Sequence, residues 1–104
     1  MNDNTESSVL KNLNFSSALH CIQDGLKMSR TAWWDDKRMF VFLVDGSTFL
    51  VNRKPLLGIY KEGTSVTYHP HIDMSHRDGY ITPWTPTQAD MLSKDWYVLN
   101  ITDV

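Results

Sequence analysis

The alternation of apolar and polar residues predicts one N-terminal helix followed by several strands. Asn14 stands where it can cap a helix over residues 15–24, in which apolar residues recur every three or four positions. Gly25 follows where a left-handed residue commonly ends a helix. The apolar stripe of this helix is expected to pack on a core, and a short strand is predicted at 26–29.

The next apolar segment predicts a hairpin. Residues 39–44 form an unbroken run of β-branched, aromatic and other apolar side chains, typical of a central strand. Asp45-Gly46 is a strong turn dipeptide, so this strand is expected to pair with residues 48–51. The polar residues that follow lead to Pro55, which cannot continue a strand ladder.

A second hairpin is predicted further along the chain. Residues 66–74 alternate between apolar and polar side chains, and Asp78-Gly79 is expected to turn the chain into a strand at 80–84. Pro70 has no amide proton to donate, so it is expected to lie at a bulge or an edge of the sheet.

A short helix and a last strand complete the pattern. Thr85 is expected to cap the helix, with Pro86 at its first position and Gln88 completing a capping box, and residues 96–99 form the strand. The fold class predicted is α+β, with one N-terminal helix packed on a mainly antiparallel sheet of about five strands and one short second helix. One helix covers one face of such a sheet, so the other face must be polar, bind a ligand or contact another subunit.

Length and composition limit this fold to a single domain. The chain has 104 residues, of which 1–13 are expected to be a flexible lead-in and 14–104 a single binding domain. A net charge of −2 gives no general attraction to polymeric nucleic acid or to an anionic membrane. The single Cys21 excludes an internal disulfide, and no apolar run approaches the about 18 residues of a membrane span, so a cytoplasmic protein is expected.

One histidine-rich segment admits several interpretations. On a strand, His69, His71 and Asp73 would project from one face and could ligate a metal. The same groups could instead bond to the backbone and to one another, or bind a ligand directly. The sequence contains neither a nucleophile elbow nor a glycine-rich phosphate loop, so no cofactor is expected and enzyme motifs are absent.

The remaining polar and aromatic residues suit a nucleotide-like ligand. Purine rings stack on aromatic faces, and pyrophosphate oxygens bind arginine side chains and backbone amides. The candidate aromatic faces are Trp33, Trp34, Tyr60, Tyr68 and Trp84. The candidate positive charges are Arg30, Arg53 and Lys54. The side chains that could hydrogen-bond to the edge of a base or ribose are Asn52, Asp73 and Gln88. Each also has a structural alternative, as a core aromatic residue or a solvated charge.

A set of short segments, which occur in the same order along the chain, is similar to one known family. They are Asn14-Phe15-Ser16, Ala18-Leu19, 39–44, 46–49, Val51-Asn52-Arg53, 55–60, Glu62-Gly63-Thr64, 68–74, Gly79, Pro83-Trp84, Gln88, Asp90-Met91-Leu92 and Asp95-Trp96. Through these segments, residues from about 14 to 98 resemble the phage anti-Thoeris family of the second type.

This resemblance implies a phage immune-evasion protein that sequesters a Thoeris signalling nucleotide, glycocyclic ADP-ribose of the 1''-3' type, without cleaving it. It also implies a homo-oligomer, a dimer of dimers with pockets between subunits, in the cytoplasm of the infected bacterial host. Some relatives hold cyclic dinucleotides at a separate place, to which no residue is assigned here.

The resemblance also implies roles for individual residues. Trp34 and Trp84 are expected to enclose the adenine, with Trp33 as the alternative to Trp34. The other expected ligand contacts are Asn52, Arg53 and the backbone amides of Gly46-Ser47 for pyrophosphate and ribose, and His71 and Asp73 for sugar hydroxyls. Gln88 is a further candidate contact, for a base or ribose edge, on its side-chain chemistry alone.

Two other functions remain open at the level of sequence. A metal-assisted phosphodiesterase that uses His69, His71 and Asp73 would also silence a cyclic nucleotide signal. A protein-binding inhibitor of a host effector would use the uncovered face of the sheet.

Overall fold

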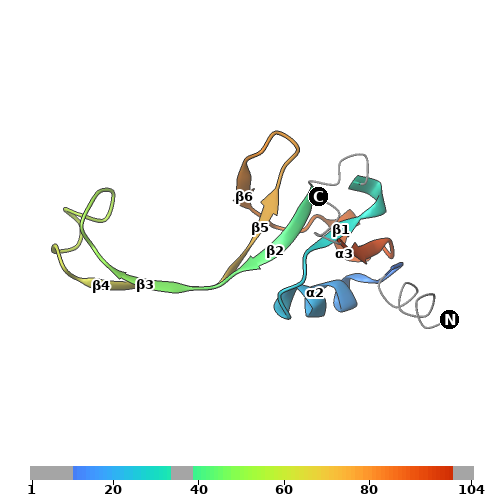
Figure 1. Ribbon diagram of the computed structural model, residues 1–104, viewed down its shortest axis with the longest axis horizontal. Helices are drawn as coiled ribbons and strands as arrows, with labels where there is room; N and C mark the ends of the chain where they lie inside the picture. The colour runs from blue at the N-terminus through green and yellow to red at the C-terminus, as the bar shows by residue number, and fades with distance from the viewer. Residues whose placement is uncertain (1–10, 34–38, 100–104) are drawn as a thin grey trace.

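The computed structural model describes residues 11–33 and 39–99, which form a body and a long two-stranded arm (Figure 1). The elements are α2 (Phe15–Gln23), β1 (Met28–Arg30), the 3₁₀ helix η1 (Thr31–Trp33), β2 (Phe40–Val44), β3 (Ser47–Leu50), β4 (Ser65–Tyr68), β5 (His71–Ser75), β6 (Ile81–Pro83), α3 (Gln88–Leu92) and β7 (Trp96–Val98). The body sheet has the order β6-β5-β2-β1-β7 and is antiparallel throughout, while β3 and β4 pair separately. The predicted α+β fold class is confirmed.

Local sequence signals set the ends of α2 as predicted. The Asn14 side chain accepts a hydrogen bond from the Ser17 backbone N–H at 2.9 Å, which satisfies a donor that the first turn leaves unpaired. Gly25 adopts a φ of 92°, a conformation that costs a residue with a Cβ much more.

The core lies between α2 and one face of the body sheet. Ala18 and Ile22 on the helix are fully buried. They pack in one cluster with Met28, Val41 and Met74, which are paired across β1, β2 and β5 and therefore share a face. Within residues 11–33 and 39–99, no helix covers the opposite face of these strands.

The first predicted hairpin is wrong. β2 and β3 follow one another along the same ribbon, with β5 and β4 as their respective partners. A two-residue hairpin at Asp45-Gly46 would need a positive φ at the glycine, and Gly46 does not adopt one. Gly46 instead allows close approach of the partner strand, because a Cβ there would collide with the Tyr68 carbonyl oxygen. The chain reverses direction between β3 and β4, in the loop at 51–64.

The second predicted hairpin is confirmed, since β5 pairs with β6 and Gly79 has a φ of 89° in the connection. The alternating segment 66–74 is divided between β4 and β5, with Pro70 at the interruption, as its missing amide proton predicts.

The cap of the short helix α3 differs from the prediction. Thr87, not Thr85, caps it, and Asp90, not Gln88, completes the capping box. A charged carboxylate placed to accept the cap N–H, and buried beside an arginine, explains why Asp90 takes this place.

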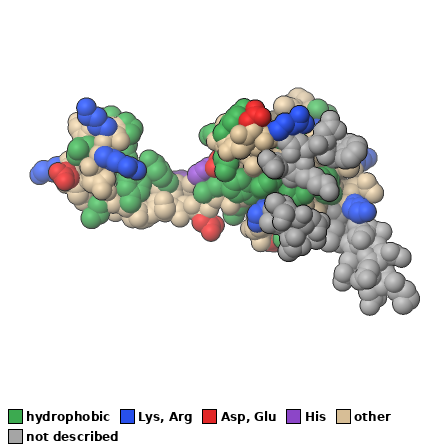
Figure 2. Space-filling model, turned by 45° about the horizontal axis from the view of Figure 1, so that its top comes forward, with side chains coloured by type: hydrophobic (Ala, Val, Ile, Leu, Met, Phe, Trp, Pro, Cys, Tyr) green, Lys and Arg blue, Asp and Glu red, His purple; other side chains and the backbone are tan. Residues whose placement is uncertain are grey.

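The arm gives the molecule an elongated shape. Its principal extents are 58 × 28 × 26 Å, and the radius of gyration is 17.3 Å, compared with about 13 Å for a compact chain of this length. Figure 2 shows the tip of the arm as a lobe joined to the body by a narrow neck. An isolated two-stranded ribbon is at best marginally stable in water, so this arm is expected to need further contacts.

Candidate functional site

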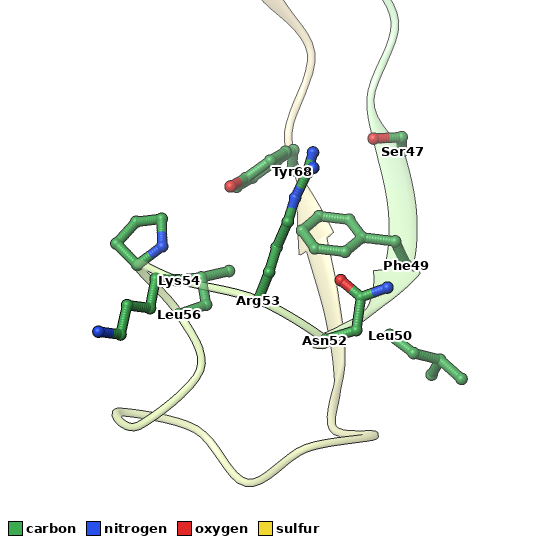
Figure 3. Close-up of a pocket in the computed structure, with 9 residues that line it drawn as sticks. Ser47, Phe49, Leu50, Asn52, Arg53, Lys54, Leu56 and Tyr68 are labelled. Atoms are coloured by element: carbon green, nitrogen blue, oxygen red, sulfur yellow. The ribbon is translucent and has the colours of Figure 1, made fainter.

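A cavity of about 520 Å³ lies at the tip of the arm (Figure 3). Strands β3 and β4 form one side and the loop at 51–64 forms the other. The lining residues are Ser47, Phe49, Leu50, Asn52, Arg53, Lys54, Pro55, Leu56 and Tyr68. This volume falls within the usual range for small-molecule sites, about 300–1,000 Å³.

Strand register and loop hydrogen bonds build this cavity. Ser47 is paired with Tyr68 across the ribbon, and Phe49 lies on the same face as Ser47 because strand side chains alternate. The Phe49 and Tyr68 rings are 5.1 Å apart between centroids and tilted by 57°. The Arg53 carbonyl accepts a hydrogen bond from the Leu57 N–H at 3.0 Å, which closes a turn within the loop. The Val51 N–H donates to the Thr64 carbonyl at 2.9 Å, which closes the base of the loop next to the strands.

The tip is electropositive although the chain is acidic. Residues 47–68 contain Arg53, Lys54 and Lys61 but only one acidic residue, Glu62, so they carry +2 while the whole chain carries −2. Figure 3 shows the Arg53 side chain extending toward Tyr68, while Lys54 points away from them. The cavity therefore combines a guanidinium, an amide from Asn52 and aromatic rings, which suits a planar anionic ligand.

A second aromatic group lies in the body. The Trp33, Trp84 and Trp96 rings meet edge to face, with centroids 5.2 Å apart for Trp33–Trp96, 6.0 Å for Trp84–Trp96 and 6.4 Å for Trp33–Trp84. Phe15 of α2 packs on both Trp84 and Trp96. Trp96 is fully buried, whereas Trp33 and Trp84 are only partly buried and pack against the core from outside. These two indoles are therefore the members of the group that can also contact a ligand.

An ion-pair network lies directly beside these indoles. Arg30 at the end of β1 donates from Nη1 to Asp90 at 2.8 Å and from Nε to Asp95 at 2.9 Å. The second Asp95 oxygen accepts hydrogen bonds from the Thr31 hydroxyl at 3.0 Å and the Ala32 N–H at 3.1 Å. Burial by itself would raise the pKa of Asp95, but hydrogen bonds from Arg30, Thr31 and Ala32 outweigh it and lower that pKa.

Acid is expected to remove the contribution of Asp95 to stability. Because its pKa is lower in the folded than in the unfolded protein, the contribution is complete above the unfolded pKa, about 4, and is lost as the pH falls through the folded pKa. As the pH falls below about 4, the wild-type free energy of unfolding should therefore approach that of Asp95→Asn. Urea denaturation at a series of pH values measures this, and a difference between the two proteins that stays constant with pH would contradict it.

The histidine-rich segment does not form the alternative metal site. Nε2 of His71 lies 3.4 Å from Asp73 Oδ1, and Nδ1 of His71 lies 3.3 Å from the His69 carbonyl oxygen. Within residues 11–33 and 39–99, no three His, Cys, Asp or Glu side chains gather in a group that could hold a metal ion. The His71 side chain thus contacts the backbone and Asp73, which is part of one of the alternatives that the sequence left open.

Residues 13–99 match the Tad2-like family, described as the Thoeris anti-defense 2-like domain. The chain belongs to this Thoeris anti-defense 2-like family. Among curated proteins, Thoeris anti-defense 2 of Bacillus phage SP01 is 26% identical over 88 residues, covering 85% of this chain and 96% of that protein. The family resemblance stated from the sequence is confirmed.

In this Thoeris anti-defense 2-like chain, the predicted site residues lie in separate places. The arm-tip cavity brings together Ser47, Asn52 and Arg53. Trp33 and Trp84 are instead in the body. Trp34 lies outside the described residues.

The other three predicted residues lie on other surfaces of the body. His71 and Asp73 alternate with the core residues Ile72 and Met74 on β5, so they lie on the sheet face opposite α2. Gln88 is exposed on α3. Within one chain these residues do not converge on a single pocket.

Sequence reasoning missed part of the cavity lining. Phe49, Leu50, Pro55 and Leu56 were not expected there. The alternation of Ser47, Thr48 and Phe49 was a usable signal for Phe49, because it places that ring on the same strand face as Ser47.

In the described part of the chain, neither α-helix has the length or the apolar character to cross a bilayer.

Proposed function

We propose that this protein binds glycocyclic ADP-ribose of the 1''-3' type, or a closely related cyclic signalling nucleotide, and holds it intact. A phage would thereby deprive the Thoeris defence of its messenger in the cytoplasm of the infected host. Membership of the Thoeris anti-defense 2-like family and the similarity to Thoeris anti-defense 2 of Bacillus phage SP01 support this role. The proposed activity is sequestration and not catalysis.

The arm-tip cavity is the observation that carries the proposal. Arg53 offers a guanidinium to pyrophosphate oxygens, and Asn52 and Ser47 offer hydrogen bonds to ribose hydroxyls. Phe49 and Tyr68 supply ring faces in the same cavity. A ligand with two phosphates and a purine matches each of these groups, and a cyclic dinucleotide offers similar chemistry.

Retention of a messenger at submicromolar concentration needs a Kd near 1 nM, about −12 kcal/mol. A ligand of this size reaches such affinity only when most of its surface is enclosed. In one chain the arm strands β3 and β4 lie apart from β1 and β6 in the body, and Trp33 and Trp84 come soon after β1 and β6 along the chain (Figure 1). We therefore place the complete pocket between subunits, where the arm of one copy meets the body of another in a dimer of dimers.

Exposed apolar residues on the arm support this assembly. The tip has little core of its own, so large apolar side chains there are exposed to solvent. Exposed apolar clusters commonly mark interfaces. The exposed residues are Leu50, Ile59, Tyr60 and Tyr68.

Ile59→Glu is expected to shift the protein to smaller assemblies. Ile59 is 78% exposed, so the charge costs the single chain little, but burying it at an interface is unfavourable. Light scattering after gel filtration measures the mass. Equal masses for Ile59→Glu and wild type would remove this part of the arm from the interface.

Binding and ligand integrity should be measured on the same sample. Calorimetry with glycocyclic ADP-ribose and with a cyclic dinucleotide gives the affinities, and chromatography after heat denaturation shows what is released. The proposal expects tight binding and release of unchanged nucleotide. A hydrolysis product would support the phosphodiesterase alternative. Capture of a Thoeris effector without any nucleotide bound would support the protein-binding alternative.

A further inference from the structure

Three segments meet at the edge of the indole group. They are the end of β1, the single turn of η1 and the residue before β7, and the Arg30–Asp95 pair joins them. The Thr31 N–H also donates to the Asp95 carbonyl at 3.1 Å, so backbone and side chain of Asp95 both hold the start of η1. η1 ends at Trp33, which is followed in the sequence by Trp34.

Arg30 also contacts the indole directly. Its guanidinium carbon lies 6.0 Å from the centroid of the Trp33 ring, at the limit of a cation–π contact. Only 13% of the Arg30 side chain is exposed, and both of its hydrogen-bonded carboxylates come from the C-terminal part of the fold. The Asp90 and Asp95 carboxylates therefore both fix the position of this guanidinium.

Asp90 connects the network to the other indoles. Its carboxylate is 7% exposed and accepts from Arg30, while its backbone carbonyl accepts a hydrogen bond from Nε1 of Trp96 at 3.0 Å. Trp96 in turn contacts both Trp33 and Trp84 edge to face. The network therefore touches the indole group at Trp33 and at Trp96.

We propose that Arg30 and Asp95 are positioning residues for the ligand site, which hold Trp33 in the orientation that receives the nucleotide. The proposal rests on the function proposed above, in which the body indoles form part of the pocket. It assigns the pair no contact with the ligand.

A charged pair suits this role better than it suits stabilisation. A buried ion pair contributes little more stability than apolar residues of the same volume would, because desolvation offsets its attraction, although loss of one partner alone is destabilising. A planar guanidinium held by two carboxylates permits only a narrow range of orientations. A three-residue 3₁₀ turn has few hydrogen bonds of its own. Without Asp95, Trp33 would sample several orientations, and binding would have to restrict it, which weakens affinity.

Two variants separate positioning from folding. In Asp95→Asn the side chain has one oxygen that accepts hydrogen bonds and one NH2 group that only donates. It therefore cannot accept hydrogen bonds from Arg30 and from the Ala32 N–H on its two sides, as the carboxylate does. Thr31→Val removes only the hydroxyl bond to Asp95 and leaves the ion pair intact. The matched control is Asp24→Asn, which makes the same charge change in an exposed pair with His20 at the end of α2.

The measurements are the Kd for glycocyclic ADP-ribose, the near-ultraviolet circular dichroism of the indoles and the melting temperature. We expect a Kd about tenfold higher in Asp95→Asn and a smaller rise in Thr31→Val, each with a weaker indole signal and unchanged far-ultraviolet spectrum. Asp24→Asn should match wild type in all three.

A purely structural role would lower the melting temperatures but leave the Kd and the indole signal of the folded variants unchanged, and that result overturns the proposal. If Asp95→Asn does not fold, Thr31→Val decides by the same criteria. If wild type binds no nucleotide, the proposed function fails, and the indole signal of Thr31→Val still decides whether the pair orders Trp33.

Discussion

Replacement of Arg53 with alanine is expected to weaken nucleotide binding by about 10- to 100-fold. Hydrogen bonds to charged groups contribute about 1.5–3 kcal/mol, and Arg53 is the cavity's guanidinium donor for a pyrophosphate. The side chain is exposed on a loop, so the melting temperature should not change. Isothermal titration calorimetry measures the Kd.

Lys61→Ala is the matched control for this prediction. The substitution removes a positive charge from the same loop, but Lys61 does not line the cavity. A specific contact at Arg53 predicts that Arg53→Ala loses far more affinity than Lys61→Ala. Equal losses in the two variants would show that the tip acts only through its overall charge, and no loss in either would exclude the arm-tip cavity from the site.

Trp84→Ala is expected to reduce messenger retention by about 5- to 150-fold, the equivalent of the about 1–3 kcal/mol that an aromatic side chain contributes when it stacks on a base. Trp84 also packs on Trp33, Trp96 and Phe15, so the variant should melt at a lower temperature. Trp84→Leu keeps more of this packing but offers no ring face, and it should show a similar loss of affinity with less loss of stability.

The control for Trp84 comes from the same aromatic group. Phe15→Leu removes a ring whose centroid lies 6.3 Å from that of Trp84 and 5.7 Å from that of Trp96. This ring is not part of the proposed pocket. The substitution should lower the melting temperature while leaving the Kd of the folded protein close to wild type. If Trp84→Leu binds as tightly as wild type, Trp84 is a packing residue and not a ligand contact.

The local elements were predictable because their signals lie within a few residues of one another. Asn14 and Gly25 mark the ends of α2, and Asp78-Gly79 marks a tight turn, each through backbone geometry that depends on neighbouring residues alone. The α3 cap shows the limit of this approach. Thr85 and Thr87 are both adequate caps by sequence, and the buried contact of Asp90 with Arg30, 60 residues away along the chain, favours the second.

Part of the predicted site lies together in the structure and part of it does not, and the roles of these residues stay predictions. Arg53, Asn52 and Ser47 were expected to act together, and they line one cavity. Trp84, His71 and Asp73 were expected at the same pocket, yet the fold places them in the body, with the indole and the β5 pair on different surfaces. Alternation along β5 was available from sequence, but the identity of the covered face depends on where α2 packs.

The sequence by itself determined the α+β class and the N-terminal helix, because periodicity and capping are properties of short segments. The assignment of its polar and aromatic residues to a cyclic nucleotide stays a prediction. Only the tertiary structure decided that β2 continues past Gly46 into an arm, and that the arm carries the cationic cavity away from the indoles. The physical reason is that strand pairing joins residues 40–50 to 65–75, and the free energy of such long-range pairing depends on the partner strand and not on the turn dipeptide alone.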